Sequence, residues 1–350
     1  MTLQPGKSRG YTLIEIVLVL GLLGIVLSTI GLMVRQGYQL HYVQLDRLEA
    51  HQNGRTALEF IKSSLRKTAW GASNGLNHRG TIVVGGCFDD SLADSKDCNN
   101  VDDGSDRIRV YRGLADPHFF RQQQDPNEVA SSQIRVSKLD SVAEEYLEGK
   151  LGLISGKCLE TPYVGTSAVV ITSASNGVYS YKPFGGGNTQ LACPGGFTDF
   201  SFGAAEAVDF FIDRTDEARG PVLMMRRYEK ELGSDDAESA GLEVAGGIEN
   251  LQIQYGIDSS EPVDNIVDRW CNDPFAVLGE CSLALSEEES LARIIAARVE
   301  IVARNVRKRT SMVGNLRKEI RSQDSEPIEV DDGYQRYIYR ATVALRNKRL

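Results

Sequence analysis

Glu15 is the residue whose chemistry stands out first, because it lies four residues into an otherwise apolar run from Tyr11 to Val34. On insertion scales, a carboxylate in a membrane-spanning segment costs about 3 kcal/mol. Ionisable groups that persist in such segments generally have a function. The run also begins abruptly after Gly10. We therefore expect Glu15 to do more than interrupt an apolar anchor.

The cysteines are the second group of reactive residues. Their number is even and no C-x-x-C spacing occurs, which argues against a zinc ribbon or a thioredoxin-like site and favours disulfides in an oxidising compartment. Neighbouring pairing (87–98, 158–193, 271–281) is the preferred arrangement, because each pair brackets a loop-like stretch; the other connectivities stay open. The six cysteines are Cys87, Cys98, Cys158, Cys193, Cys271 and Cys281.

The remaining residue types predict no catalytic or metal site. The four histidines are scattered, without the H-x-x-x-H spacing of a metal site, and no G-x-S-x-G or phosphate-binding loop occurs. The acid-rich stretch Gly85–Asp106 does not carry both the glycine and the glutamate that an EF-hand loop requires. It is expected to be a solvated loop closed by a disulfide. We predict no enzymatic activity and no cofactor.

The apolar run Tyr11–Val34 predicts one membrane span. A helix of this length would reach about 36 Å, enough to cross the hydrocarbon core. Lys7 and Arg9 precede it, and positive flanks stay cytoplasmic. No small-residue cleavage site follows the run, so a secretory signal cut at that place is not expected. With 41% apolar and 25% charged residues in 350, the rest is typical of a globular body on the exported side.

The helix is expected to continue beyond the membrane. No proline occurs between Pro5 and Pro117, and the segment from Val34 to Thr68 is amphipathic. An unbroken helix from Tyr11 to Ala69 would be about 88 Å long. Gly54 and three earlier glycines are expected weak points of this helix. The apolar residues assigned to one packed face are Leu45, Leu48, Leu58, Ile61 and Leu65.

After Trp70 the sequence becomes β-rich, with short apolar or alternating runs between Gly, Asn and Asp turns. The segments 208–213 and 221–228 predict a hairpin, and alternation in 334–347 predicts a half-buried antiparallel strand. The fold class is therefore α+β, a long N-terminal helix packed on an antiparallel β-sheet head. The other expected strands are 81–84, 107–111, 167–171, 177–181, 251–257 and 298–303.

The stretch G-Y-T-L-I-E, Gly10 to Glu15, resembles the type IV prepilin signature in its basic leader, glycine, glutamate and apolar length. The resemblance implies that a prepilin peptidase cuts between Gly10 and Tyr11 and that the new N-terminus at Tyr11 is methylated. Most family members carry phenylalanine where this chain has Tyr11, so the aromatic character is kept. Glu15 would then pair with the α-amino group of a neighbouring subunit in the filament core, where a paired carboxylate is far cheaper than a lone one.

A narrower resemblance is to the PilW family of minor pilins. It rests on the Gln52–Arg55 run (QNGR) within Arg47–Ala72, with further pieces at Gly104–Arg112, Leu242–Asp258 and Arg340–Asn347. The domains expected from it are a leader at 1–10, a transmembrane and filament-core half of the helix at 11–34, an amphipathic half at 35–70, and a disulfide-containing head at 71–350.

This family resemblance implies a structural subunit without enzymatic activity. PilW-like minor pilins prime pilus assembly in the inner membrane and are placed near the pilus tip. The implied partners are other minor pilins, the major pilin, the prepilin peptidase, the inner-membrane assembly platform and a tip adhesin. The head would face the periplasm before assembly and lie outside the cell in the pilus. Because apex subunits of related complexes tend to lack the glutamate, Glu15 places this chain below the apex.

Two alternatives remain open at this point. A J-type minor pseudopilin of a type II secretion system shares the leader, the glutamate and an NGR-containing helix, although such chains are generally shorter. The other alternative is a signal-anchored periplasmic binding protein or DNA-uptake receptor. Whether the filament serves motility, adhesion, secretion or DNA uptake is not decided by these residues.

A basic cluster close to the C-terminus suggests one partner surface. Residues 291–350 hold 14 basic and 7 acidic residues, in a chain whose net charge is −9. We expect this basic end to bind an acidic partner pilin. Nucleic acid is not the expected ligand, because no aromatic residues interleave the RNVRKR run. The clustered residues are Arg304, Arg307, Lys308 and Arg309.

Overall fold

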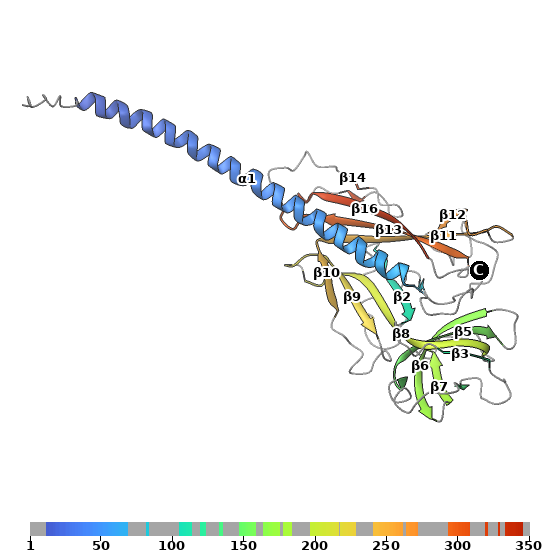
Figure 1. Ribbon diagram of the computed structural model, residues 1–350. Coiled ribbons are helices and arrows are strands. Elements are labelled where there is room, and N and C mark those ends of the chain that lie inside the picture. Colours follow the sequence, from blue (N-terminus) through green and yellow to red (C-terminus); the bar gives the residue numbers. More distant parts are fainter. Residues whose placement is uncertain are drawn as a thin grey trace, which may run out of the picture. The chain divides into compact units, whose positions relative to one another are not determined.

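A long helix followed by antiparallel sheets makes up the computed structural model, which confirms the predicted α+β class (Figure 1). The chain divides into two compact units, residues 1–49 and 50–350. The residues that the structure describes are 12–68, 82–83, 105–113, 120–123, 133–135, 147–158, 164–175, 178–183, 197–216, 218–228, 241–261, 264–271, 293–308, 319–320, 328–329 and 333–345.

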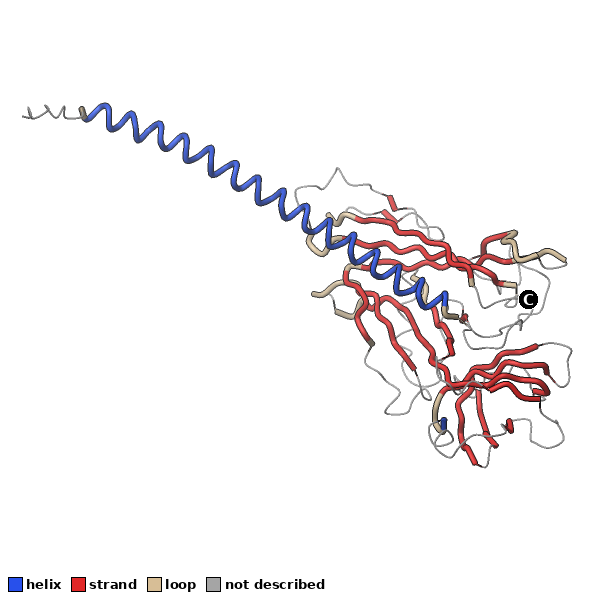
Figure 2. The backbone as a smooth tube through the Cα atoms, in the orientation of Figure 1, coloured by secondary structure: helices blue, strands red, loops and turns tan. Residues whose placement is uncertain are grey.

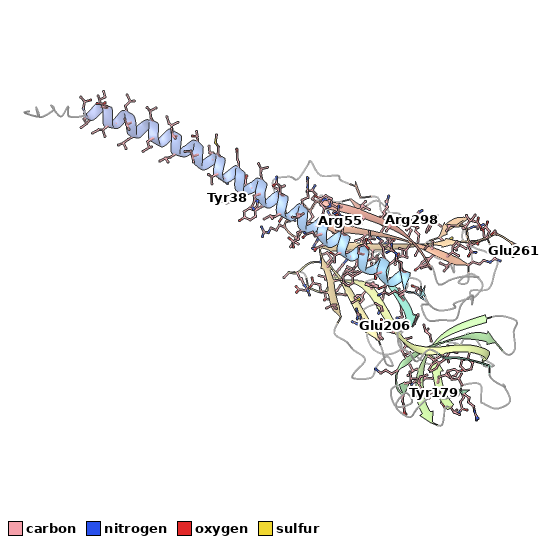
Figure 3. All side chains as sticks on the ribbon, in the orientation of Figure 1. Tyr38, Arg55, Tyr179, Glu206, Glu261 and Arg298 are labelled. Carbon is pink, nitrogen blue, oxygen red and sulfur yellow. The ribbon has the colours of Figure 1, made fainter. Side chains whose placement is uncertain are left out.

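Helix α1 (Leu13–Arg66) runs without interruption through both halves of the predicted helix and ends three residues before the predicted Ala69. It is long and apolar enough to cross a membrane, by length and composition. In the described part of the N-terminal unit nearly all of its side chains are exposed, as Tyr38 illustrates (Figure 3), and Asp46 is the buried exception.

The packed face of α1 begins at Ala50. Ala57, Leu58, Ile61 and Leu65 continue it and are all buried, at the spacing of one helical stripe. The assignment of Leu45 and Leu48 to that face was wrong, since they expose 46% and 54% of their surface. At about 100° per residue, Leu45 lies about 160° around the helix from Ile61, so both cannot face the same core.

Two sheets form the body that receives this stripe. The body strands of the first sheet are β1 (Ile82–Val83), β2 (Ile108–Gly113), the second half of β8 (Phe197–Asp213), β9 (Val222–Tyr228) and β10 (Leu242–Gly246). The second sheet has the order β12-β11-β13-β16, from β11 (Ile248–Ile257), β12 (Arg269–Cys271), β13 (Ile294–Arg304) and β16 (Arg336–Ala344), all antiparallel. Strands β14 (Glu319–Ile320) and β15 (Ile328–Glu329) pair separately.

One hydrophobic core joins α1 to both body sheets. It combines Ile61 and Leu65 of the helix with residues such as Val208 of β8, Leu251 of β11 and Val299 of β13. The chain passes from the first sheet to the second at Gly247, which has φ +70 and whose added Cβ would lie 2.6 Å from the Arg304 carbonyl oxygen. Glycine is therefore required at this corner.

Two specific strand predictions are confirmed. The segments 208–213 and 222–228 pair antiparallel as β8 and β9, with Asp213 opposite Val222. In β16 the burial alternates as predicted: Val343 is buried, while Ile338 and Arg340 face outward. The alternation therefore places one face of the last strand on the core.

A second group of strands, which we call the lobe, lies in the sequence between β2 and the second half of β8. It consists of β3 (Phe120–Gln123), β4 (Gln133–Arg135), β5 (Leu151–Cys158), β6 (Val164–Ser175), β7 (Val178–Pro183) and the first half of β8. Strand β8 is shared, because its first half pairs with β3 and β5 and its second half with β2 and β9. Figure 2 shows the lobe strands joined to the others through β8.

A buried ion-pair cluster holds the first sheet together on the face away from α1. Asp209 of β8 is fully buried and accepts hydrogen bonds from Arg109 (Nε to Oδ1, 2.6 Å; Nη2 to Oδ2, 2.8 Å) and from Arg107 (Nη2 to Oδ2, 2.7 Å). The guanidinium groups of Arg107 and Arg226 each lie over the Phe211 ring, 5.3 and 5.2 Å from its centroid. These contacts join β2, β8 and β9 by charge and cation–π attraction.

Candidate functional site

Glu15, the predicted assembly residue, lies in the first turn of α1, and its backbone N–H donates to the Thr12 carbonyl at 3.0 Å. The positive end of the helix dipole favours a carboxylate at this place. Leu13 and Ile14 beside it expose 81% and 73% of their surface. Gly10 and Tyr11 lie outside the described residues, so cleavage, methylation and the charge pair remain predictions.

No part of the apolar 18-residue stretch of α1 is buried within the chain. Exposed apolar surface on this scale marks a membrane or protein contact. The described N-terminal unit, residues 12–49, therefore needs lipid or another subunit to cover it.

The QNGR run is where the helix docks onto the head. The Asn53 side-chain amide donates to the Gly246 carbonyl at 3.0 Å. The His51 ring packs at a tilt against Tyr337, with ring centroids 4.2 Å apart, and its Nδ1 hydrogen-bonds the Tyr339 hydroxyl. These contacts tie the helix to the β10–β11 corner and to β16.

Gly54 lets the Tyr339 ring approach the helix backbone. A Cβ at this position would lie 2.5 Å from Tyr339 Cδ2 and closer still to Cε2. The expectation of a weak point in the helix was wrong here, because α1 continues through Gly54 and the glycine makes room for a packed ring. Sequence reasoning missed this role; its only signal was an isolated glycine inside a helical pattern, which often has a packing reason.

We expect Gly54→Ala to destabilise the head by about 1–3 kcal/mol, because the methyl group overpacks a ring already held by His51. Thermal unfolding of the purified chain measures this. Thr56→Ala, at an exposed position on the same helix, is the matched control and should change little. Adding Tyr339→Leu to Gly54→Ala should recover part of the loss. Equal unfolding of Gly54→Ala and wild type would contradict this docking.

The basic cluster divides into an inner and an outer part. Arg304 Nη1 donates to Glu249 Oε1 at 3.3 Å, and its guanidinium stacks 4.2 Å from the Tyr334 centroid. Arg336 binds the same carboxylate, with Nη2 to Oε1 at 2.8 Å. Arg304 is therefore directed into the body, with 18% of its side chain exposed.

The outer part of the cluster is Arg307 and Lys308, both exposed immediately after β13 beside the half-exposed Val306. Arg309 lies outside the described residues. The predicted partner surface is thus represented in the structure by two exposed cations and one apolar side chain.

The loop after β11 is acidic, and its central carboxylate accepts hydrogen bonds from residues of the same loop. Asp258 is buried and accepts from Ser260 (N and Oγ), Asp264 N and Asn265 N, at 2.5–3.1 Å. Burial raises its pKa, but these hydrogen bonds outweigh burial and hold it below the ordinary value. Within the described part of the chain, no cluster of three or more His, Cys, Asp or Glu side chains is arranged to hold a metal ion.

Cys271 of β12 is buried in the main core and is disulfide-bonded. The side chains of the other five cysteines lie outside the described residues. The pairing therefore remains a prediction.

Sequence comparisons match known families at the N-terminal segment and over the C-terminal part of the chain. Residues 209–347 match the family of type IV pilus-assembly protein W (PilW), and residues 5–31 match the prokaryotic N-terminal methylation motif. Over these two ranges the chain is similar to PilW proteins and to prepilins. Pilin-family proteins are structural and not enzymes. The apolar helix with its prepilin motif indicates anchoring in the inner membrane before pilus assembly.

Among solved structures, a type IV-like pilin from Thermus thermophilus is similar, with 11% identity, a TM-score of 0.24, and coverage of 59% of this chain and 93% of that one. No curated protein matches the sequence significantly.

Proposed function

We propose that this chain is a PilW-type minor pilin that primes assembly of a type IV pilus and is incorporated near its tip. The observation that carries the proposal is a prepilin motif whose glutamate lies in the first turn of one unbroken helix, and this helix docks into a PilW head. After cleavage between Gly10 and Tyr11 and methylation of Tyr11, Glu15 neutralises the α-amino group of a neighbouring subunit. Because Glu15 is retained, we expect the chain to lie below the apex.

This charge pair explains how an anchor becomes part of a fibre. In lipid, the exposed apolar face of α1 is covered by acyl chains; in the fibre, helices of other subunits replace them. A lone carboxylate or ammonium in that core is expensive, whereas a hydrogen-bonded pair is much less so. Docking in other axial registers leaves both charges unpaired, so the pair selects one register.

Placement near the tip is tested by gold-labelled antibodies against the head on sheared filaments. We expect label at one end of each filament and an amount of this chain per filament that does not rise with filament length. Label spaced along the shaft would overturn the tip placement. Label confined to the envelope, with unlabelled filaments, would instead favour a secretion pseudopilin.

Arg307 and Lys308 are proposed to contact an acidic surface of the next subunit. Reversing both (Arg307→Glu with Lys308→Glu) should lower the amount of chain in sheared filaments several-fold, because like charges then meet across the contact. The matched control reverses two exposed cations of the lobe, Arg135→Glu with Lys182→Glu. Equal incorporation of both double variants would remove the basic surface from the assembly contact.

A further inference from the structure

The lobe leaves and rejoins the body at one point of the first sheet. The last residue of β2, Gly113, is the Cα partner of Ala205 in β8. Residues 114–204 therefore begin and end on directly opposite positions of an antiparallel pair. Domains are inserted into hosts at such places, because the host strands can close without the insert.

The lobe has a hydrophobic core of its own. This core includes Ile154, Val169, Tyr179, Phe200 and Phe202, and all of its buried residues come from 114–204. The rings of Tyr179 and Phe202 are 5.7 Å apart, and Tyr179 is seen within the lobe in Figure 3.

The body core is equally independent of the lobe. The buried cluster around α1 contains no described residue between 114 and 204. A third, smaller cluster joins the two parts, with Leu151, Leu153 and Val170 from the lobe. The body supplies Tyr111, Ala205, Ala207 and Tyr228.

At the lobe positions whose side-chain exposure the structure describes, the exposed residues are polar or glycine: Arg135, Glu148, Gly149, Thr172, Ser173 and Lys182. None of the exposed large apolar side chains at positions so described belongs to the lobe. Permanent subunit interfaces are more apolar than this, whereas reversible contacts resemble ordinary protein surface. Both family matches, 5–31 and 209–347, also lie outside 114–204.

We infer that residues 114–204 are an inserted module that the pilin body needs neither for folding nor for incorporation. In the assembled filament this module stays exposed, outside the pilin packing. The inference rests on the proposed pilin function. It assigns assembly to the body alone.

The first test removes the lobe by joining Gly113 to Ala205 through Asn-Gly, a sequence that favours a two-residue hairpin turn. A second variant uses the five-residue linker Gly-Ser-Asn-Gly-Ser, so that turn geometry alone does not decide the result. We expect at least one variant to unfold cooperatively and to enter sheared filaments within about twofold of wild type. Failure of both to fold, or a folded variant that stays in the membrane, would overturn the inference.

The second test uses the unmodified chain and compares the labelling of two exposed lysines. A membrane-impermeant amine reagent is applied to sheared filaments and to detergent-solubilised protein, and labelling is read by mass spectrometry. Lys182 of the lobe should react equally in both samples, whereas Lys308 should be protected in filaments. Protection of Lys182 by fivefold or more would place the lobe in the packing and contradict its role. Absence of wild-type chain from filaments would instead defeat the proposed function.

Discussion

A chain carrying Glu15→Leu is expected to insert and to be processed normally, but to be depleted at least tenfold from sheared filaments. Leucine favours the membrane, so anchoring does not suffer. In the fibre, however, the α-amino group of the neighbouring subunit loses its counter-ion. Removing one member of a buried charge pair costs about 3–5 kcal/mol, well beyond the 1.4 kcal/mol of a tenfold change. Immunoblots of membrane and sheared fractions measure the ratio.

Glu15→Asp is the matched variant, because it keeps the charge on a shorter side chain. It should fall between wild type and Glu15→Leu. Glu49→Leu, which removes a carboxylate from an exposed position of the same helix, controls for the charge change itself. Normal incorporation of Glu15→Leu would show that assembly does not depend on this carboxylate.

Asp209→Asn is expected to destabilise the head by about 3–5 kcal/mol, the usual effect of removing one partner of a buried ion pair. Arg109 and Arg107 would lose the carboxylate that both guanidinium groups contact. Denaturant unfolding measures the difference in free energy. Asp216→Asn, in the exposed turn between β8 and β9, makes the same chemical change and should stay within about 0.5 kcal/mol of wild type.

The same cluster predicts an acid dependence. Burial raises the pKa of Asp209, but the hydrogen bonds and charges of Arg109 and Arg107 outweigh burial and hold it below its ordinary value. A lowered folded pKa means that the unfolded chain binds more protons between the two pKa values. The stabilisation is therefore complete above the unfolded pKa, about 4, and is lost as the pH falls through the folded pKa.

Asp209→Asn should accordingly show a flatter loss of stability below about pH 4 than wild type. Asp258 titrates in the same direction and will remain in both proteins, so the difference between the two curves isolates Asp209. Identical acid curves would contradict the assignment of Asp209 as a stabilising ion pair.

Sequence reasoning succeeded where one local pattern decides the structure. The β8–β9 hairpin has two apolar runs around a polar turn, and burial in β16 alternates from Tyr337 onward, so period and turn chemistry suffice. The long proline-free helix was likewise predictable. The hairpin and β16 lie in the region that matches PilW, and the helix begins within the methylation motif.

The lobe was not predicted as a unit. The expected strands 167–171 and 177–181 correspond to β6 and β7, but the other lobe strands lack such patterns. In β5, Gly152 and Gly156 read as turn residues, yet Gly152 has Phe202 packed against its backbone. The first half of β8 contains few β-branched residues and is held by pairing on both sides. Such long-range packing overrides local propensity.

The basic cluster shows that basic residues close in sequence need not share one surface. Arg304 and Arg307 are three positions apart, but the first is in β13 and contacts Glu249, whereas the second follows the strand and faces outward. The carboxylate of Glu249, which binds Arg304 and so draws it inward, lies on β11, far from both arginines in the sequence. In the same way, the packing role of Gly54 could not be predicted without knowing that Tyr339, on β16, contacts it.

The most direct test of the pilin assignment is mass spectrometry of the N-terminal peptide of this chain from sheared filaments and from membranes. We expect a methylated peptide that begins at Tyr11 in the sheared filaments. An intact Met1–Gly10 leader in both fractions would contradict it and leave a membrane-anchored periplasmic protein outside any filament.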